Sequence, residues 1–337
     1  MEISASESKL VTITDVSGAG EARRVASRLA DEYGFSETSK GELAIVVTEA
    51  ARNVAIHGQG GQVLLRPWRN SEGGSGVEVL VIDSGPGMAN VANSMRDGVS
   101  TAGTPGTGLG AISRMSSFFE MYTAAGKGTL LYLNVLNGHN HRERLPRLGV
   151  VSVAKPGESE CGDGWGFVQD GPRTILMVVD GLGHGAGARE ASADAAEVFR
   201  KYATLGSDRV LRKMHDSLRK TRGAAVSIAE LDAISRTIKY SGVGNIQGVI
   251  VSDNGVQRLV SHTGTVGFVM GRTQEFTYAW PPSSLLIMHS DGIDTRWDLE
   301  RYRGIRAKHP AIAAGMIYRD HRRTRDDATV LAYAEQQ

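Results

Sequence analysis

The residue pattern changes at a polar segment near the middle of the chain, and this break constrains the fold more than any other feature. Residues 138–148 are mostly polar or charged and include a proline, which is typical of a linker. Helix and strand patterns alternate before it, and short strand patterns dominate after it. Because 337 residues exceed the usual size of one domain, we predict two domains, at 1–137 and 149–337.

The first half has the pattern of a layered α/β domain. Apolar residues recur at helical spacing in some segments and form shorter runs beside glycine-rich turns in others. Helices are expected at 20–33, 40–57 and in a short segment ending near 117, and strands at 10–13, 62–66, 77–82, 118–123 and 129–135.

The second half is predicted to be rich in strands, with helices between them. The Asn254-Gly255 pair between two apolar runs is a strong signal for a hairpin. Strands are expected at 149–154, 166–169, 174–179, 224–231, 237–241, 248–252, 256–261 and 285–289, and helices at 187–202 and 207–222. This order favours a second, independent layered domain.

The composition is that of an ordinary globular protein, with 41% apolar and 22% charged residues. A net charge of +1 indicates neither nucleic acid nor a membrane as a partner. The single cysteine, Cys161, excludes an intramolecular disulfide and fits a reducing compartment. We see neither a membrane-spanning apolar stretch nor a signal-peptide pattern, so we expect the protein in the cytoplasm.

Two polar residues share a face of the helix predicted at 40–57. Glu49 and Asn53 are four positions apart, which places their side chains together. An amide oxygen can complete the coordination of Mg²⁺ beside phosphate, and a carboxylate can orient or deprotonate a nucleophile near a γ-phosphate. Taken alone, such a pair is better explained as the solvated face of an amphipathic helix.

Two glycine-rich stretches follow in an order that fits a nucleotide pocket. Asp83, Gly85 and Gly87 come directly after an apolar strand, where a carboxylate can accept a hydrogen bond from an exocyclic amine. The stretch 103–110 precedes a helix, so its backbone N–H groups can hold phosphates. The order of the three elements is much more specific than any one of them.

Over residues 10–137 the chain resembles the histidine-kinase-like ATPase superfamily, and within it the anti-sigma-factor-type serine kinases. The resemblance implies that Glu49 is the catalytic base and that Asn53 binds Mg²⁺. It assigns the adenine-binding motif to Asp83, Gly85 and Gly87, and the phosphate-lid motif to Gly106, Thr107, Gly108 and Gly110.

This resemblance also implies a fold, cofactors and partners. The fold would be a mixed sheet backed by helices, and the cofactors ATP and Mg²⁺. The substrate would be a serine or threonine on a STAS-domain protein (sulfate transporter and anti-sigma antagonist). The Arg52-Asn53 pair resembles the switch kinases of stress-signalling complexes, so a stressosome-type partner is expected. A homodimer is compatible with the resemblance.

In the second half, aspartates stand beside glycines at the ends of predicted strands. Oxygen ligands without a cysteine or histidine set favour Mg²⁺ or Mn²⁺. Two such ions can activate a water molecule and hold a phosphate ester for in-line attack. Any single Asp-Gly pair is also an ordinary turn. Asp163, Asp180 and Asp291 stand beside glycines, and Asp326 begins the later segment Asp-Asp-Ala-Thr.

Over residues 149–333 the chain resembles the PPM-type metal-dependent phosphatases, in their SpoIIE-like branch. The resemblance implies an α-β-β-α sandwich. Asp163 and Asp180 would bridge two Mn²⁺ or Mg²⁺ ions, and Gly181 would add its carbonyl. Asp291 and Asp326 would complete the site; Asp327 is the less expected member of its pair.

Other residues near these motifs remain open between roles. We see no obvious arginine to bind the phosphate, although Arg173 or the basic run 319–325 are candidates. His184 fits a proton donor and a packed turn residue equally well. The segment 242–246 resembles a motif of the same phosphatase branch and is expected to form a turn near the site.

The sequence therefore predicts a bifunctional regulator of partner switching. The first domain would phosphorylate a STAS-type protein, and the second would remove phosphate from phosphoserine or phosphothreonine. The alternative is a phosphatase whose first domain is a non-catalytic, nucleotide-dependent binding module. A Rossmann oxidoreductase is disfavoured, because no glycine-rich turn follows the first strand and opens a helix as that fold requires.

Overall fold

The computed structural model describes residues 1–3, 6–88, 108–138 and 146–335. The chain divides into two compact units. The first unit contains Ser8–Arg69 and Gly73–Leu145, and the second contains Met1–Glu7, Asn70–Glu72 and Pro146–Gln337. No helix in the described ranges is both long and apolar enough to cross a bilayer.

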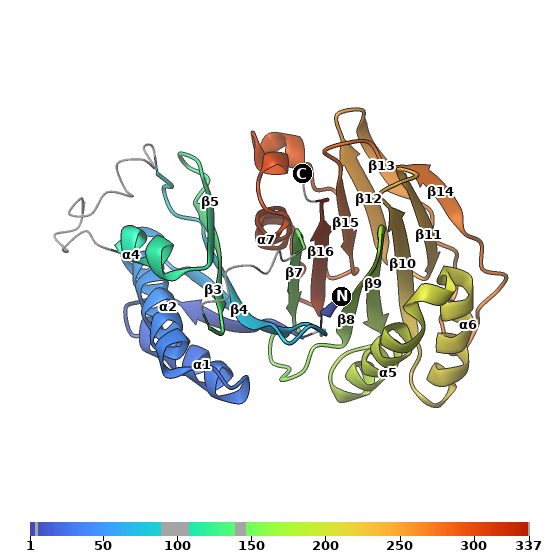
Figure 1. Cartoon of the computed structure of the whole chain (residues 1–337), viewed down its shortest axis with the longest axis horizontal. Coiled ribbons are helices and arrows are strands. Elements are labelled where there is room, and N and C mark those ends of the chain that lie inside the picture. The colour runs from blue at the N-terminus through green and yellow to red at the C-terminus, as the bar shows by residue number, and fades with distance from the viewer. Residues whose placement is uncertain (4–5, 89–107, 139–145, 336–337) are drawn as a thin grey trace. The chain divides into compact units, whose positions relative to one another are not determined.

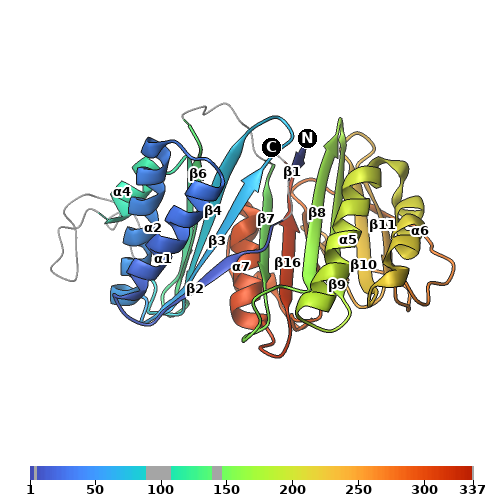
Figure 2. The same cartoon turned by 90° about the horizontal axis from the view of Figure 1, so that it is seen from below.

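The first unit is a sheet covered by helices. Its elements are β2 (Lys9–Ile13), α1 (Gly18–Glu32), α2 (Glu37–His57), β3 (Gly61–Arg69), β4 (Ser75–Asp83), α4 (Gly108–Met115), β5 (Phe118–Thr123) and β6 (Thr129–Leu136). The five strands follow the order β2-β3-β4-β6-β5, and α1 and α2 lie side by side on one face (Figure 2).

Every pairing in this sheet is antiparallel, where a mixed sheet was expected. Tight turns join β3 to β4 and β5 to β6, and such turns connect only antiparallel strands. The layered α/β class of the unit is as predicted.

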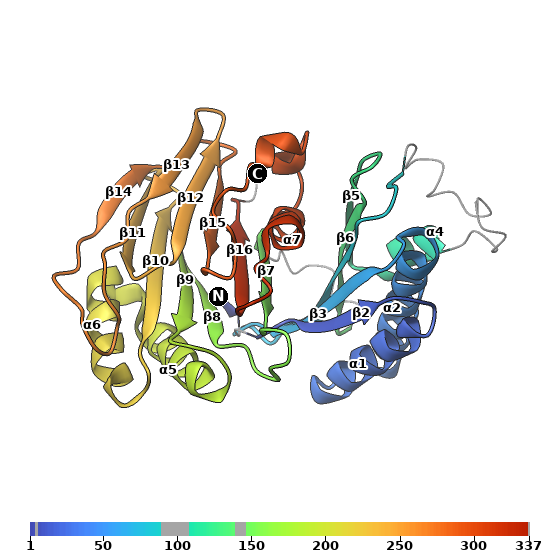
Figure 3. The ribbon, with the colours of Figure 1, turned by 180° about the vertical axis from the view of Figure 1, so that it is seen from behind.

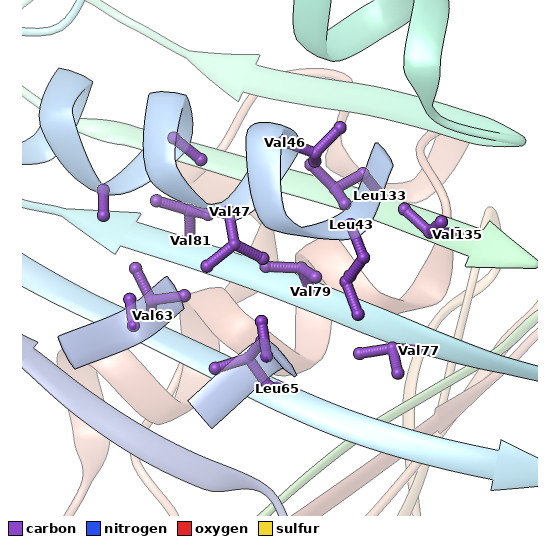
Figure 4. Packing of buried hydrophobic residues seen from close by; sticks show 14 of the residues in the cluster. Leu43, Val46, Val47, Val63, Leu65, Val77, Val79, Val81, Leu133 and Val135 are labelled. Carbon is purple, nitrogen blue, oxygen red and sulfur yellow. The ribbon is translucent and has the colours of Figure 1, made fainter. Parts of the chain in front are cut away.

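The core of the first unit lies between α2 and the sheet (Figure 4). Leu43, Val46 and Val47 come from α2 and are fully buried. They meet strand residues that share one face because they alternate along β3, β4 and β6. Those partners include Val63, Leu65, Val77, Val79, Val81, Leu133 and Val135. The same packing presents Glu49 and Asn53 away from the core.

The second unit contains two sheets and three helices. Its elements are β1 (Glu2–Ile3), β7 (Leu148–Val153), β8 (Asp163–Asp170), β9 (Arg173–Gly181), α5 (Ala186–Tyr202), α6 (Ser207–Ser217), β10 (Ala224–Asp232), β11 (Thr237–Val243), β12 (Gln247–Ser252), β13 (Gly255–Leu259), β14 (Phe276–Ala279), β15 (Leu285–His289), α7 (Pro310–His321) and β16 (Ala328–Tyr333). Short 3-10 turns follow α5 and α6 and precede α7.

The two sheets pack face to face between helices, which confirms the predicted α-β-β-α sandwich. One sheet has the order β1-β8-β9-β10-β11-β14, and the other β13-β12-β15-β16-β7. Helices α5 and α6 cover the first sheet (Figure 1), and α7 packs against β7 and β16 (Figure 3). Between the sheets, Thr174 Oγ1 lies 3.1 Å from the hydroxyl oxygen of Tyr333. Gly248 admits the ring of Tyr240, because a Cβ there would lie 2.7 Å from a ring carbon.

Four elements of the second unit were not expected from the sequence: α7, β1, β14 and β16. Helix α7 is buried on nearly all sides from Pro310 to Tyr318, so it lacks the apolar stripe that identifies a surface helix. Its start is nevertheless well formed, because Pro310 occupies the first turn and the backbone N–H of Ala311 donates to His309. Strand β1 has two residues and pairs with β8, β14 pairs with β11, and β16 pairs with β15 and β7.

Candidate active sites

Two of the predicted metal ligands lie opposite each other on neighbouring strands. Asp163 begins β8, Asp180 lies near the end of β9, and the two are register partners in the antiparallel ladder. Residues paired in this way project from the same face of a sheet, with Cβ atoms about 5 Å apart. The predicted bridging pair is therefore brought together by strand pairing alone.

The other sheet delivers the remaining aspartates to the same end of the sandwich. Asp291 follows β15, and Asp326 precedes its antiparallel neighbour β16. Ser290 joins the two sheets: its hydroxyl donates to Asp163 Oδ2 at 2.6 Å and accepts from the Thr329 N–H at 3.0 Å. One hydroxyl thus links Asp163 of one sheet to the segment of the other sheet that carries Asp291.

Neighbouring residues hold the site through specific hydrogen bonds. Asn245 donates to Asp291 Oδ2 at 2.8 Å, which places the turn expected at 242–246 beside the site. Both oxygens of Asp327 accept backbone N–H groups, from Lys155 at 2.7 Å and from Gly162 at 3.0 Å. Both carboxylate oxygens of Asp327 are thus held by backbone donors, whereas one oxygen of Asp326 accepts the N–H of Asp327 at 3.0 Å.

Burial and the charges of neighbouring carboxylates raise the pKa values of the carboxyl groups in this cluster. Burial raises the pKa of Asp163 to about 7, and its hydrogen bond from Ser290 opposes that rise. Burial, and next the charge of Asp163, raise the pKa of Asp180 to about 9. The pKa of Asp291 is also raised, again mainly by burial. A set of clustered oxygen donors with raised pKa values fits a hard divalent cation.

The side chains do not yet enclose an ion. In the described part of the chain, no three histidine, cysteine, aspartate or glutamate side chains converge into a closed ligand set. The strand pairing of Asp163 with Asp180 and the hydroxyl bridge of Ser290 nevertheless bring the segments that carry these side chains to the same end of the sandwich.

The glycine-rich turn after β9 packs tightly against α5. A Cβ at Gly181 would overlap the carbonyl of Ala188, and Gly183 and Gly185 have φ angles of +92° and +69°. Within this turn, His184 Nδ1 lies 2.7 Å from a carboxylate oxygen of Glu158. His184 is thus half exposed and paired with a carboxylate, and it does not fill the core.

In the first unit, α2 presents its polar pair to the start of α4. A Cβ built on Gly108 would lie 3.4 Å from Glu49 Oε2 and 3.5 Å from both side-chain atoms Nδ2 and Oδ1 of Asn53. Arg52 Nη1 lies 3.7 Å from the other oxygen of Glu49. The first backbone N–H groups of α4, which have no helical partner, therefore stand beside the two polar side chains.

The predicted adenine-binding residues form a compact corner at the end of β4. Asp83 Oδ1 accepts from the N–H of Gly85 at 2.9 Å and from the N–H of Thr129 at 3.1 Å. A Cβ on Gly85 would lie 2.9 Å from the backbone of Gly58, so a larger residue does not fit. Gly87 has a φ of +67°, which favours glycine.

The phosphate-lid prediction falls only partly on described residues. Gly108 and Gly110 lie in the first turn of α4, with Gly110 buried. Gly106 and Thr107 lie outside the described residues. Sequence reasoning also missed two contributors, Ser290 and Thr129. Ser290 belongs to the Ser-Asp-Gly motif, so the sequence could have identified it. Thr129 contributes only its backbone N–H, which no side-chain pattern in the sequence indicates.

Comparisons with known proteins divide the chain in the same way. The family model described as histidine kinase-like ATPase domain matches residues 14–135, and the one described as stage II sporulation protein E (SpoIIE) matches residues 170–334.

Two relatives come from Bacillus subtilis (strain 168). The serine/threonine-protein kinase RsbT is 31% identical over 108 residues, which cover 32% of this chain and 80% of that protein. The phosphoserine phosphatase RsbX is 28% identical over 148 residues, which cover 43% of this chain and 73% of that protein.

Among solved structures, one from work on the bacterial stressosome, described as a modular system adapted to control secondary messenger signaling, is similar with a TM-score of 0.53. It is 26% identical, and the match covers 57% of this chain and 100% of that one. The chain therefore belongs to the RsbT-like kinase family through its histidine kinase-like ATPase domain, and it carries a SpoIIE-like phosphatase domain of the PPM type in its second unit.

Proposed function

We propose that this protein is a bifunctional regulator of partner switching, which adds phosphate to a STAS-type protein with one unit and removes phosphate from serine or threonine with the other. The observation that carries the proposal is the gathering of Asp163, Asp180, Asp291 and Asp326 from four strands at one end of the sandwich.

In the second unit, those four aspartates and the carbonyl of Gly181 would hold two Mn²⁺ or Mg²⁺ ions. Bound ions would lower the pKa of water and neutralise the charge of the phosphate. Ser290 fixes one oxygen of Asp163, and Asn245 fixes one oxygen of Asp291. These hydrogen bonds orient the ligands before the substrate arrives.

The reaction is hydrolysis of a phosphate ester. The oxygen of water forms a bond to phosphorus, the bond from phosphorus to the serine oxygen breaks, and the serine oxygen takes a proton. His184 is suited to supply that proton, because Glu158 holds its ring at the edge of the glycine-rich turn. The products are inorganic phosphate and the unmodified protein.

In the first unit, the proposed reaction is transfer of the γ-phosphoryl group of ATP. Asn53 would bind Mg²⁺, Asp83 would accept a hydrogen bond from the adenine amine, and the N–H groups at the start of α4 would contact phosphates. Glu49 would take the proton of the attacking serine hydroxyl. The serine oxygen then bonds to the γ-phosphorus, and ADP leaves.

A second candidate function is supported by the contact between Arg52 and Glu49. An ion pair at 3.7 Å competes for the carboxylate that the kinase reaction needs. In this alternative the first unit binds nucleotide and a partner but transfers no phosphate. The two candidates differ in one outcome: whether label from ATP appears on a STAS-domain protein.

The relatives support the proposed partners. RsbT and the stressosome structure point to a STAS-type or stressosome-type protein as the substrate of both units. The single cysteine supports a cytoplasmic location. A homodimer and the exact limits of the two domains stay predictions from the sequence.

The experiment measures hydrolysis of an aryl phosphate with Mn²⁺, with Mg²⁺ and with EDTA. We expect metal-dependent turnover that is lost in Asp180→Asn and kept in Asp170→Asn, a matched change at the far end of β8. Turnover that persists in EDTA or in Asp180→Asn contradicts the proposed site. In parallel, labelled ATP is incubated with purified STAS-domain proteins, and transfer is expected to disappear in Glu49→Ala and Asn53→Ala.

A further inference from the structure

The proposed ions would neutralise part of the phosphate charge, and a cationic side chain at the rim of the aspartate cluster would add directional donors to the phosphate oxygens. Arg173 is too far away. It begins β9, and Asp180 is seven residues further along, which is about 23 Å at the rise of an extended strand. Its guanidinium also contacts Glu230 at 3.1 Å and Asp170.

Two arginines of the basic run 319–325 are held in other contacts. Arg319 donates to Asp320 at 2.7 Å and has a side chain only 9% exposed. Arg322 donates to the hydroxyl of Tyr318 at 2.6 Å and to the carbonyl of Ala154 at 2.9 Å. Their guanidinium groups stabilise α7 and its surroundings.

Arg323 is placed differently, because it is anchored to the loop that carries Asp291. Its backbone N–H donates to the carbonyl of Gly292 at 2.7 Å, and its Nη1 donates to the carbonyl of Asp291 at 3.1 Å. A bridge between Ile293 and Arg322 ties the same two loops together. Arg323 therefore contacts the backbone beside one proposed ligand, Asp291, and precedes another, Asp326, by three residues in the sequence.

The guanidinium of Arg323 keeps capacity for an anion. Its side chain is 51% exposed, and its nearest carboxylate, that of Asp294, is 4.0 Å away. Asp294 is already held by Arg296, whose Nη2 and Nε donate to it at 2.7 and 3.0 Å. Because a guanidinium has five N–H donors in a planar fork, one bond to a carbonyl leaves donors for a phosphate.

We infer that Arg323 binds the phosphate group of the substrate at the aspartate cluster. This inference rests on the proposed phosphatase function and adds a binding residue that the motifs of the chain do not identify. A planar guanidinium can contact two phosphate oxygens at once, whereas a lysine offers only a point charge.

The test compares Arg323→Ala, Arg323→Lys and Arg323→Gln with Arg325→Ala, which removes an equal charge from an exposed position in the same loop. We expect the KM for an aryl phosphate and the inhibition constant of inorganic phosphate to rise by about tenfold or more in Arg323→Ala. Arg323→Lys is expected to recover part of the loss. Arg325→Ala is expected to stay within about threefold of the wild type.

A second readout separates phosphate binding from ligand positioning. Calorimetric titration with Mn²⁺ alone is expected to give the same affinity in wild type and Arg323→Ala. A large loss of Mn²⁺ affinity would show that Arg323 serves to position Asp291, and the inference would be wrong. An unchanged inhibition constant, or an equal effect of Arg325→Ala, would also overturn it.

Failure of the proposed function can be told apart from failure of this inference. If the folded wild type shows no turnover, the proposed phosphatase reaction fails. Phosphate binding is then measured directly, as the rise in Tm that inorganic phosphate causes in the Mn²⁺-loaded protein. A rise in the wild type that is absent in Arg323→Gln supports the inference, and an equal rise in both overturns it.

Discussion

Replacing Asp180 by asparagine is expected to stabilise the metal-free protein while abolishing its phosphatase activity. The carboxyl is largely buried and faces four other carboxylates, so its pKa rises from 3.8 to about 9. An asparagine has nearly the same shape, but its side chain does not ionise and so places no charge in the cluster. The substitution therefore removes an electrostatic cost that the folded state carries whenever no cation is bound.

The size of the effect follows from the difference in pKa between the folded and unfolded states. At about pH 7 the unfolded chain has released this proton and the folded chain has kept it. The gap of about three pH units above 3.8 corresponds to about 4 kcal/mol of lost stability at most. Part of this cost comes from repulsion by neighbouring carboxylates, which can also take up protons. We therefore expect Asp180→Asn to raise the free energy of unfolding by about 2–4 kcal/mol, or Tm by about 5–10 °C.

The sign of the pH dependence is a sharper test than the size. A raised carboxyl pKa lowers stability above the unfolded pKa of 3.8, and the loss grows until the folded pKa of about 9. The difference between the variant and the wild type should be small near pH 4 and increase towards alkaline pH. Urea denaturation in EDTA across this range, with Asp170→Asn as the control, measures it.

With Mn²⁺ the order should reverse, because an ion that binds only the folded wild type adds stability that the variant cannot gain. The reasoning is refuted if Asp180→Asn is less stable than the wild type in EDTA at neutral pH. It is equally refuted if any advantage of the variant does not change with pH.

Three further outcomes are expected. Ser290→Ala should cost about 1–3 kcal/mol in urea denaturation and weaken Mn²⁺ binding, because the hydroxyl that orients Asp163 is lost; unchanged stability would contradict the bridge. Cys161 should not react with a thiol reagent until the protein is unfolded, because it is fully buried and burial raises the pKa of its thiol; rapid reaction of the folded protein would contradict this. Gly85→Ala should lower ATP affinity in calorimetry, because a Cβ would lie 2.9 Å from the backbone of Gly58; equal affinity would argue against a tight corner.

Sequence reasoning was most successful where a local pattern determines the structure. Strand β15 has the limits that its apolar run predicts, and β8 and β9 pair so that Asp163 meets Asp180. Asp163, Asp180 and Asp291 could be singled out because each stands beside a glycine in the sequence, whereas Asp326 was identified through the resemblance to the phosphatase family.

Contacts between distant segments were beyond sequence reasoning. The hydroxyl of Ser290 meets Asp163 across 127 positions, which no spacing rule predicts. The choice between Arg173, Arg322 and Arg323 required knowing which guanidinium was already engaged. Helix α7 was missed for a related reason, because burial on all sides removes the amphipathic periodicity on which helix prediction depends.

The pairing of β1 with β8 has a consequence for the order of events during synthesis. Met1 and Gln169 are hydrogen-bonded but 168 positions apart. At ribosomal speed the first residues must wait roughly 10 to 30 s for their partner strand to be made. The residues of the first unit are synthesised within that interval, so β1 can pair with β8 only after they have been made. A protein cut within 138–145 would leave β1 on the wrong fragment, and the strand would then have to find β8 by diffusion.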